Sequence, residues 1–347
     1  MMVQKLIMTP RFFNKLLNKV VSVLILFIIN MMCVAQAAEQ TSVDQLVDPL
    51  PSWNESQAKS AIINFVTSVT MKGTPHFVSP EERIATFDND GTLWSEQPVV
   101  QGMFLINQLE QKAKKDPSIR TIQPFKSILE NDTEYLKSED VSALFKLFSF
   151  TRAGINQEVF TQQVKTFFAE AKHPVLGVPI EQVVYKPMLE LLAYLRAHGF
   201  KTYICSGGGI DFMRVVSTKL YGIPPEQVIG SSMKKELQQV EGRWELLITD
   251  TLNSINDKEI KPVNIDLHIG RRPLFAMGNV RSGGDIGMLS YSQGRKGISL
   301  QLLVNHDDEK REFAYAEKNN ASLKAAKVNN WFVVSMQNDW KSVFNHR

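Results

Sequence analysis

Strand-length apolar runs alternate with helical patterns along the second half of this 347-residue chain. The runs lie at residues 201–205, 227–230, 274–277, 299–304 and 331–336. Helical patterns cover residues 186–198 and 210–221, and a third begins after Asp285. Strands that are joined by helices pair in parallel, and the sites of such sheets lie at the carboxyl ends of the strands. The sequence therefore predicts an α/β fold in which a parallel sheet is flanked by helices.

The first half contains one helix, one strand and then a long helical stretch. Residues 56–70 place apolar side chains at helical spacing, and residues 84–87 form a further strand-length run. Helix signals then follow one another at 99–113, 125–148 and 156–171. Because the alternation resumes afterwards, we interpret residues 95–185 as a helical insertion, or cap, in a core of residues 56–94 and 186–347.

The N-terminal segment has the pattern of a secretory signal peptide. Residues 1–38 contain four basic residues and no acidic one, and an apolar run at 20–29 is followed by Ala35-Gln36-Ala37. We predict cleavage after this pattern, a periplasmic or secreted protein, and a tether over residues 39–55. The alternative is an uncleaved membrane anchor, although the apolar run is shorter than the ~20 residues of a spanning helix. After cleavage no stable membrane association is expected.

The charge of the chain gives no reason to expect nucleic acid as a partner. The whole chain has a formal charge of +3, and removing the four basic residues of the predicted signal peptide leaves −1 for the rest. A near-neutral body lacks the basic surface that binds phosphate backbones. The expected partner is a small molecule, and the sequence leaves the oligomeric state open.

Two aspartates follow the strand-length run at 84–87, in the sequence Asp88-Asn89-Asp90-Gly91-Thr92. Side chains two residues apart on an extended backbone point the same way, so Asp88 and Asp90 should face one site together. At an effective dielectric of about 20, two such charges ~4 Å apart repel by roughly 4 kcal/mol, and a divalent cation relieves that repulsion. Oxygen ligands of this kind suit Mg²⁺. The alternative is an ordinary turn, because Asn-Asp-Gly is common in loops.

Three later loops carry polar groups that suit the same site. Ser206, followed by three glycines, offers a hydroxyl and exposed backbone N–H groups to an anion. Lys261 offers a positive charge, and Asn279 and Asp285 offer oxygen atoms to a metal ion. Each feature alone also fits an ordinary turn, a solvated lysine or a helix cap. Their order and their placement after successive strands favour one shared site.

The residues of these four loops resemble the motifs of the haloacid dehalogenase (HAD) superfamily of aspartate-nucleophile phosphatases. The resemblance extends over residues 56–345 and is to the phosphoserine phosphatase-like branch. Asp88–Thr92 are similar to its first motif, Ser206 to its second, Lys261 to its third, and the loop at 278–285 to its fourth. The resemblance implies a Rossmann-like core, and the helical insertion resembles the C1 cap of that branch.

What the resemblance implies for the site is covalent catalysis. Asp88 would attack phosphorus, and Asp90 would protonate the leaving oxygen and then activate water. The phosphoryl group would be bound by Thr92, Ser206, Gly207 and Lys261. A Mg²⁺ ion would be held by Asp88, the carbonyl of Asp90, Asn279 and Asp285.

The fourth motif departs from the commonest family pattern. Asn279 stands where many relatives have an aspartate, and a longer loop precedes Asp285. Because Asn279 is a neutral ligand, weaker metal binding is expected, and whether Asp285 binds the metal directly or through water is open. Lys258 is a second candidate for the lysine of the third motif. Lys261 is preferred because it precedes Pro262 and an amphipathic helix, as in the family pattern.

The second carboxylate separates two types of reaction. Dehalogenases of this superfamily need no acid two residues after the nucleophile, whereas an alkoxide leaving group needs a proton. Asp90 therefore favours a Mg²⁺-dependent phosphomonoesterase that hydrolyses a small phosphorylated metabolite. Two alternatives remain open: a phosphotransferase that uses the same phospho-aspartate, and a non-catalytic module that binds phosphate or metal.

Three residues are weaker candidates for recognising the rest of the substrate. Glu96 lies near the place where phosphoserine phosphatases have an acid that reads the substrate amine, so it is a candidate to bind a cationic group. Arg152 and Arg214 are candidates to assist anion binding. For all three the alternative is an ordinary solvated side chain, and the sequence does not identify the phosphate ester.

Overall fold

The computed structural model describes residues 48–132, 134–135 and 141–346. The chain divides into two compact units, Met1–Pro49 and Leu50–Arg347. The predicted signal peptide and residues 39–47 of the predicted tether lie outside the described residues. Within the part that is described, no helix is long and apolar enough to span a membrane.

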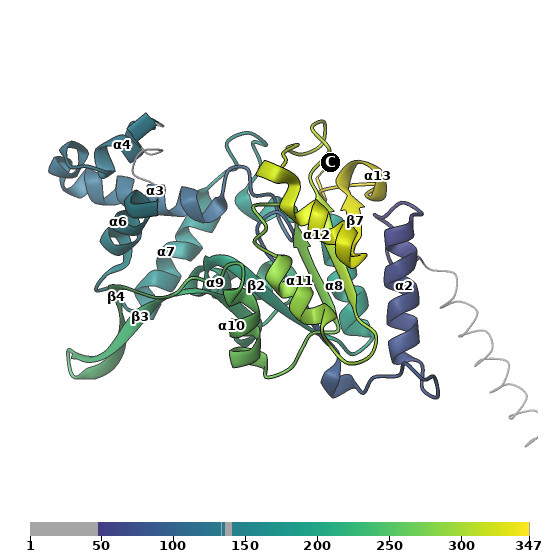
Figure 1. Cartoon of the computed structure of the whole chain (residues 1–347). Coiled ribbons are helices and arrows are strands. Elements are labelled where there is room, and N and C mark those ends of the chain that lie inside the picture. The colour runs from purple at the N-terminus through teal and green to yellow at the C-terminus, as the bar shows by residue number, and fades with distance from the viewer. Residues whose placement is uncertain (1–47, 133, 136–140, 347) are drawn as a thin grey trace, which may run out of the picture. The chain divides into compact units, whose positions relative to one another are not determined.

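A seven-stranded sheet forms the centre of the second unit (Figure 1). Its order is β4-β3-β2-β1-β5-β6-β7, and neighbouring strands are parallel except for β3 and β4. The strands are β1 (Ile84–Phe87), β2 (Lys201–Gly209), β3 (Val228–Val240), β4 (Arg243–Ser254), β5 (Phe275–Asn279), β6 (Leu300–Asn305) and β7 (Phe332–Ser335). The predicted α/β class with a mostly parallel sheet is confirmed.

Helices join the strands and flank the sheet. They are α2 (Gln57–Thr70), α3 (Val100–Lys115), α4 (Phe125–Leu129), α6 (Val141–Arg152), α7 (Gln157–Glu170), α8 (Lys186–Ala197), α9 (Ile210–Tyr221), α10 (Ile260–Ile269), α11 (Ile286–Gln293), α12 (Ala321–Asn329) and α13 (Met336–Asp339). The predicted helix at 56–70 is α2, whose N-cap Ser56 accepts a hydrogen bond from the backbone N–H of Lys59. This cap satisfies one of the free N–H groups that every helix start leaves.

Side chains from the two faces of the sheet pack into two separate hydrophobic cores. Leu302 belongs to one core and its neighbour Leu303 to the other, as expected when successive strand residues point to opposite faces. Helices α2 and α8 contribute Ile62 and Leu191 to the first core, and α10 contributes Ile265 to the second. Because helices cover both faces, the central strands are apolar on both sides and leave only their ends for polar chemistry.

Helices α3, α4, α6 and α7 make up the predicted cap insertion. A small core of its own joins three of them through Leu105 in α3, Phe125 in α4 and Leu147 in α6. The sequence predicted one helix over 125–148, whereas the structure has the two helices α4 and α6, and residues 136–140 between them lie outside the described part. Figure 1 shows α3, α4 and α6 grouped together, on the side of the molecule where the β3–β4 hairpin projects.

The β3–β4 hairpin braces the cap. The sequence predicted a strand at 227–230 and a separate hairpin, and in the structure β3 continues through both. The backbone N–H of Gly154 donates to the carbonyl of Ile248 in β4 at 2.8 Å, and the N–H of Ile248 donates to the carbonyl of Ile155 at 3.0 Å. These bonds fix the link between α6 and α7 to the sheet, so the cap is attached to the core at more than its two chain connections.

Residues 50–54 differ from the predicted tether because they pack into the core. Leu50 and Trp53 are only 0% and 2% exposed. The Trp53 indole N–H donates to the carbonyl of Pro187 at 3.0 Å, and its ring packs edge-on against Trp340 with centroids 6.0 Å apart. A solvated tether therefore ends before Leu50.

Candidate active site

The candidate site lies where β1, β2 and β5 end. Asp88 follows β1 directly, and its backbone N–H donates to the carbonyl of Met277 in β5 at 2.9 Å. A cavity of about 550 Å³ opens over these strand ends. The predicted site residues among those lining it are Asp88, Asp90, Glu96, Gly207, Lys261, Asn279 and Asp285. The structure therefore brings most of the predicted residues together at the carboxyl edge of the sheet.

Lys261 is the centre of a buried charge network. Its Nζ donates to Oδ1 of Asp88 at 2.7 Å and to Oδ1 of Asp285 at 2.5 Å. All three side chains are almost completely buried. Oδ2 of Asp285 accepts the backbone N–H of Asn279 at 3.0 Å. Lys258, the second candidate for this position, is exposed, so Lys261 is the lysine that the structure places at the site.

Negative charge is in excess at this site. The carboxylates of Asp88, Asp90 and Asp285 surround the one ammonium of Lys261. Burial raises the pKa of the Asp88 carboxyl to about 8, and Asp285 and Asp90 add to the rise while Lys261 opposes it. Burial alone would lower the pKa of Lys261, but Asp285 and Asp88 outweigh it and raise that pKa. Lys261 is therefore a cation, and a further positive charge would lower the repulsion among the carboxylates.

The carboxylate of Asp90 is held by two donors. Trp94 Nε1 donates to Oδ1 at 2.9 Å, and the hydroxyl of Ser206 donates to Oδ2 at 3.3 Å. The turn that lets Trp94 reach back passes through Gly91, which has a φ of +76°. A side chain at Gly91 would also collide with Asn279, so this position requires glycine twice over.

Ser206 opens the glycine turn that the sequence predicted as an anion cradle. In the structure β2 continues to Gly209, and α9 begins at the next residue. The Ser206 hydroxyl accepts the backbone N–H of Gly208 at 3.0 Å, and the N–H of Gly209 donates to Oε1 of Gln101 at 2.8 Å. Backbone N–H groups that precede a helix attract anions, so the turn suits the oxygen atoms of a phosphoryl group.

Glu96 lines the cavity, but its carboxylate already has partners. It forms an ion pair with Arg281 and accepts hydrogen bonds from the hydroxyl of Tyr315 and, at 3.1 Å, from Nδ2 of Asn279. The side chain is 1% exposed. Arg281 thus balances the charge that the sequence assigned to a cationic group of the substrate, and Glu96 positions Asn279.

His306 supports the turn after the nucleophile. Its Nε2 lies 2.8 Å from the carbonyl oxygen of Gly91, and its Nδ1 lies 3.3 Å from Oε2 of Glu312. Because a carbonyl oxygen can only accept, Nε2 carries a proton. Glu312 also accepts hydrogen bonds from the hydroxyls of Ser95 at 2.6 Å and Tyr185 at 2.9 Å. This buried network fixes the backbone between Asp90 and the start of the cap.

The remaining predicted residues lie outside the cavity over the strand ends. Thr92 is completely buried, and its hydroxyl has no hydrogen-bond partner among the described residues. Arg152 lines a second cavity beside the first. Arg214 donates from Nε to the carbonyl of Pro225 at 3.0 Å and lines a different pocket near α7.

Residues 85–290 match the family model of the haloacid dehalogenase-like hydrolases. The chain belongs to this family. The match covers the nucleophile strand, the cap and all four loops that form the site. No curated protein is significantly similar to the sequence.

Solved structures confirm the HAD-like fold. A conserved protein of unknown function from Anaerococcus prevotii is similar with a TM-score of 0.52 and 16% identity, over 84% of this chain and 96% of that one. A protein of unknown function from Bordetella pertussis has a TM-score of 0.45 and 13% identity, over 73% and 98% of the two chains. A phosphoserine phosphohydrolase-like protein from Francisella tularensis has a TM-score of 0.37 and 17% identity, over 71% and 99%.

HAD hydrolases generally depend on Mg²⁺, and the donor set of this chain fits that ion. The described residues hold no group of three or more His, Cys, Asp and Glu side chains arranged as a metal cage. The available oxygens are instead Oδ2 of Asp88 and Oδ1 of Asn279, neither of which accepts a hydrogen bond from a described residue. Both oxygens of Asp285 already accept one hydrogen bond each.

Sequence reasoning missed several residues of this HAD site. Trp94, Gln101, His306 and Glu312 were not predicted, although each contacts a motif residue or its backbone. Trp94 lies only four residues after Asp90, so its position in the sequence was a usable signal. For the others the contact depends on tertiary packing, and no pattern in the sequence indicates it.

Proposed function

We propose that this chain is a secreted, Mg²⁺-dependent phosphomonoesterase that hydrolyses a small phosphorylated metabolite through a phospho-aspartate at Asp88. The observation that carries this proposal is the position of Asp90. Trp94 and Ser206 hold its carboxylate at the cavity that also contains Asp88. An acid in that position can protonate an alkoxide leaving group, which a dehalogenase does not need.

The two chemical steps follow from this arrangement. Oδ2 of Asp88, the oxygen not bonded to Lys261, attacks phosphorus, and the bond from phosphorus to the ester oxygen breaks. Asp90 gives its proton to that leaving oxygen. Water then attacks phosphorus, passes a proton to Asp90 and releases inorganic phosphate, which restores the carboxylate of Asp88.

The charge that develops on the phosphoryl group needs stabilisation from several sides. Lys261 supplies one positive charge next to Asp88, and the backbone at Gly207 and Gly208 lies along the same cavity. Bound Mg²⁺, held by Asp88, the Asp90 carbonyl and Asn279, with Asp285 nearby, would act as a Lewis acid and offset the excess negative charge of the site.

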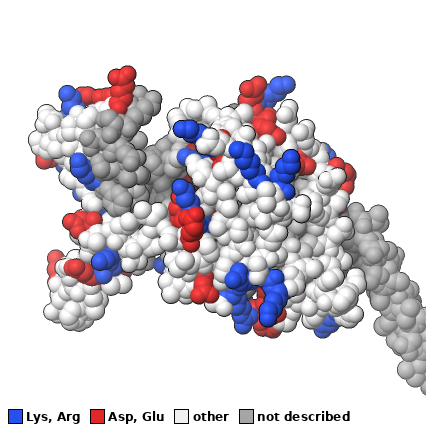
Figure 2. All heavy atoms as spheres, in the orientation of Figure 1, with Lys and Arg blue, Asp and Glu red and all other residues white. Residues whose placement is uncertain are grey.

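Secretion and the choice of partner are further parts of the proposal. The support for secretion is the sequence of residues 1–38, and intact-mass measurement of the released protein, expected to begin near Ala38, tests it. On the face drawn in Figure 2, acidic and basic side chains are interspersed over a mostly uncharged surface. Such a face offers no electrostatic support for a nucleic-acid partner, and a small phosphorylated molecule suits the cavity better.

Asp90→Asn tests the proposed role of the acid. The substitution should slow the hydrolysis of alkyl phosphates far more than that of p-nitrophenyl phosphate, whose phenolate leaves with little protonation. Loss of general acid catalysis typically costs ~10²–10⁴-fold, so the contrast between substrates should be large. Asp88→Asn is the matched control, because it removes the nucleophile and should abolish turnover of both. Equal losses for Asp90→Asn on both substrates would contradict the assignment.

A further inference from the structure

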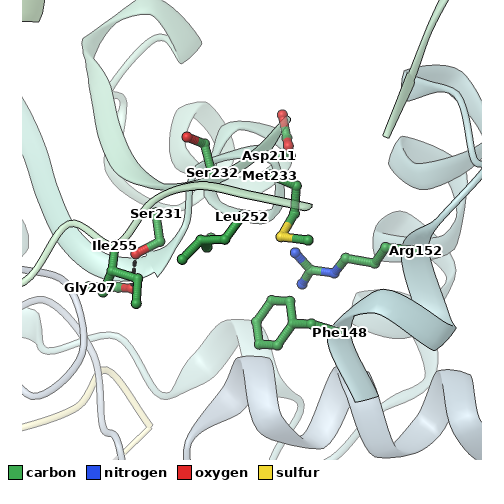
Figure 3. Close-up of a pocket in the computed structure, with 10 residues that line it drawn as sticks. Phe148, Arg152, Gly207, Asp211, Ser231, Ser232, Met233, Leu252 and Ile255 are labelled. Atoms are coloured by element: carbon green, nitrogen blue, oxygen red, sulfur yellow. Dashed lines mark hydrogen bonds between the residues drawn. The ribbon is translucent and has the colours of Figure 1, made fainter. Parts of the chain in front are cut away.

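A second cavity of about 250 Å³ adjoins the catalytic cavity, under the cap (Figure 3). The two cavities share the residues Phe148, Gly207, Gly209 and Ser231. The rest of the second cavity is largely apolar, with Met233 and Leu252 among its lining residues. A molecule whose phosphate sits over Asp88 would therefore extend into a space of mixed, mostly apolar character.

Arg152 is the exception in this apolar lining. Its side chain, in Figure 3, points from α6 toward Phe148 and Met233. It is only 4% exposed, and neither Nε nor Nη2 has a hydrogen-bond partner. Asp211 also lines the cavity, but it is paired with Lys235 at 2.6 Å. Among the described residues no carboxylate forms an ion pair with the Arg152 guanidinium.

An unpaired buried guanidinium is unfavourable unless another group compensates it. The rings of Phe148 and Phe160 lie 4.3 Å and 5.0 Å from the guanidinium carbon and provide part of that compensation. Burial lowers the pKa of Arg152 to about 10, and Asp211 opposes this, so the group remains a cation at neutral pH. Its N–H groups remain available for an acceptor that the protein itself does not supply.

Gln101 from α3 adds a second unpartnered donor. Its Oε1 accepts the backbone N–H of Gly209, and its Nε2 is buried without a hydrogen-bond partner. Gly209 lies between the two side chains: a Cβ built on it would lie 3.2 Å from Nη1 of Arg152 and 3.3 Å from Oε1 of Gln101. Two cap helices therefore direct donors, and no free acceptor, at the turn that follows Ser206.

We propose that Arg152 and Gln101 form a subsite for a second anionic group of the substrate, a carboxylate or a second phosphate. This inference rests on the proposed function, because it takes the first phosphate to be bound over Asp88. The two donors match the oxygen atoms of an oxyanion, and a guanidinium binds such groups through two parallel hydrogen bonds. The apolar lining adds that a short hydrocarbon segment separates the two anionic groups.

A set of three alkyl phosphates tests this subsite. Pentyl phosphate, 5-(phosphonooxy)pentanoate and 1,5-pentanediol bisphosphate share one leaving group and differ only at the far end. The Mg²⁺-loaded mature chain should show a kcat/KM about ten- to a hundredfold higher for an anionic substrate than for pentyl phosphate, the range expected for hydrogen bonds to a charged group. The larger of the two preferences identifies carboxylate or phosphate as the group that is read.

Variants at Arg152 separate a specific role from a general one. Arg152→Met should remove most of the preference, mainly through KM, and Arg152→Lys, which keeps a cation, should retain part of it. Arg214→Met is the matched control, because that arginine lies in another pocket, and it should keep the wild-type ratio. Thermal melting and the Arg152→Lys variant show whether a loss reflects misfolding.

Two outcomes would overturn the subsite, and they differ from failure of the proposed function. Turnover of pentyl phosphate with no preference for either anionic substrate would refute the subsite alone. A preference that persists unchanged in Arg152→Met would also refute it. Absence of phosphate release from all three substrates would instead refute the proposed phosphatase, and the subsite with it.

Discussion

Replacing Lys261 by methionine should destabilise the fold in a way that depends on pH. The ammonium is the only cation within hydrogen-bonding distance of the buried carboxylates of Asp88 and Asp285, at 2.7 Å and 2.5 Å. Breaking a buried ion pair by removing one partner costs about 3–5 kcal/mol. For a domain of this size about 1 kcal/mol lowers Tm by roughly 2–4 °C, so Lys261→Met should melt about 10 °C below wild type.

The pH dependence has a definite sign. The pKa of Asp88 is about 8 in the folded protein, because burial raises it from 3.8, and Asp285 adds to the rise. A carboxyl with a raised folded pKa contributes stability at low pH and loses it as the pH rises through that pKa. Near pH 6 Asp88 keeps its proton in both proteins. Above about pH 8 wild-type Asp88 ionises beside the ammonium, whereas the variant has no cation there, so the deficit in Tm should grow.

The assay is thermal unfolding in EDTA at about pH 6 and about pH 9. Lys258→Met is the matched control, since that lysine is exposed three residues away and its loss should change Tm little. A deficit of the same size at both pH values would mean that Lys261 acts through packing alone. A deficit as small as that of Lys258→Met would refute the charge network.

Three further predictions follow from the same structure. EDTA should abolish turnover and Mg²⁺ should restore it, because the carboxylates at the site outnumber the one ammonium; full activity in EDTA would contradict the metal site. Trp94→Phe should lower kcat on alkyl phosphates about tenfold with less effect on p-nitrophenyl phosphate, because the indole donor orients Asp90; equal effects would indicate lost packing only. A chain that begins at residue 56 should melt several degrees below one that begins at residue 48, because it lacks Leu50 and Trp53; equal Tm values would show that this segment adds no stability.

Much of the fold and of the site could be predicted from local sequence. A buried strand that ends in Asp88 and Asp90 specifies both the chain direction and the edge of the sheet where chemistry takes place. The glycine turn after Ser206 and the loop before Asp285 follow neighbouring strands, and parallel pairing brings them to that edge. In each case residues close in sequence determine the geometry.

What the sequence could not provide depends on contacts between distant segments. Glu96 seemed available for a substrate amine, yet Arg281 and Tyr315, far along the chain, already occupy its carboxylate. Arg152 seemed an ordinary surface arginine, and only the packing of α6 over the sheet shows that it is buried without a partner. Residues 50–54 resembled a tether because two apolar side chains are too few for a periodic signal.

The central claim is that Asp88 carries the phosphoryl group during turnover, and an acid quench tests it directly. The Mg²⁺-loaded protein is mixed with an alkyl phosphate that it hydrolyses, quenched in acid during turnover, digested and analysed by mass spectrometry. The peptide that contains Asp88 should gain the mass of one phosphoryl group, and a brief treatment with hydroxylamine should remove it, as expected of an acyl phosphate. Phosphate release without any labelled Asp88 peptide, or a label on another residue, would contradict the account.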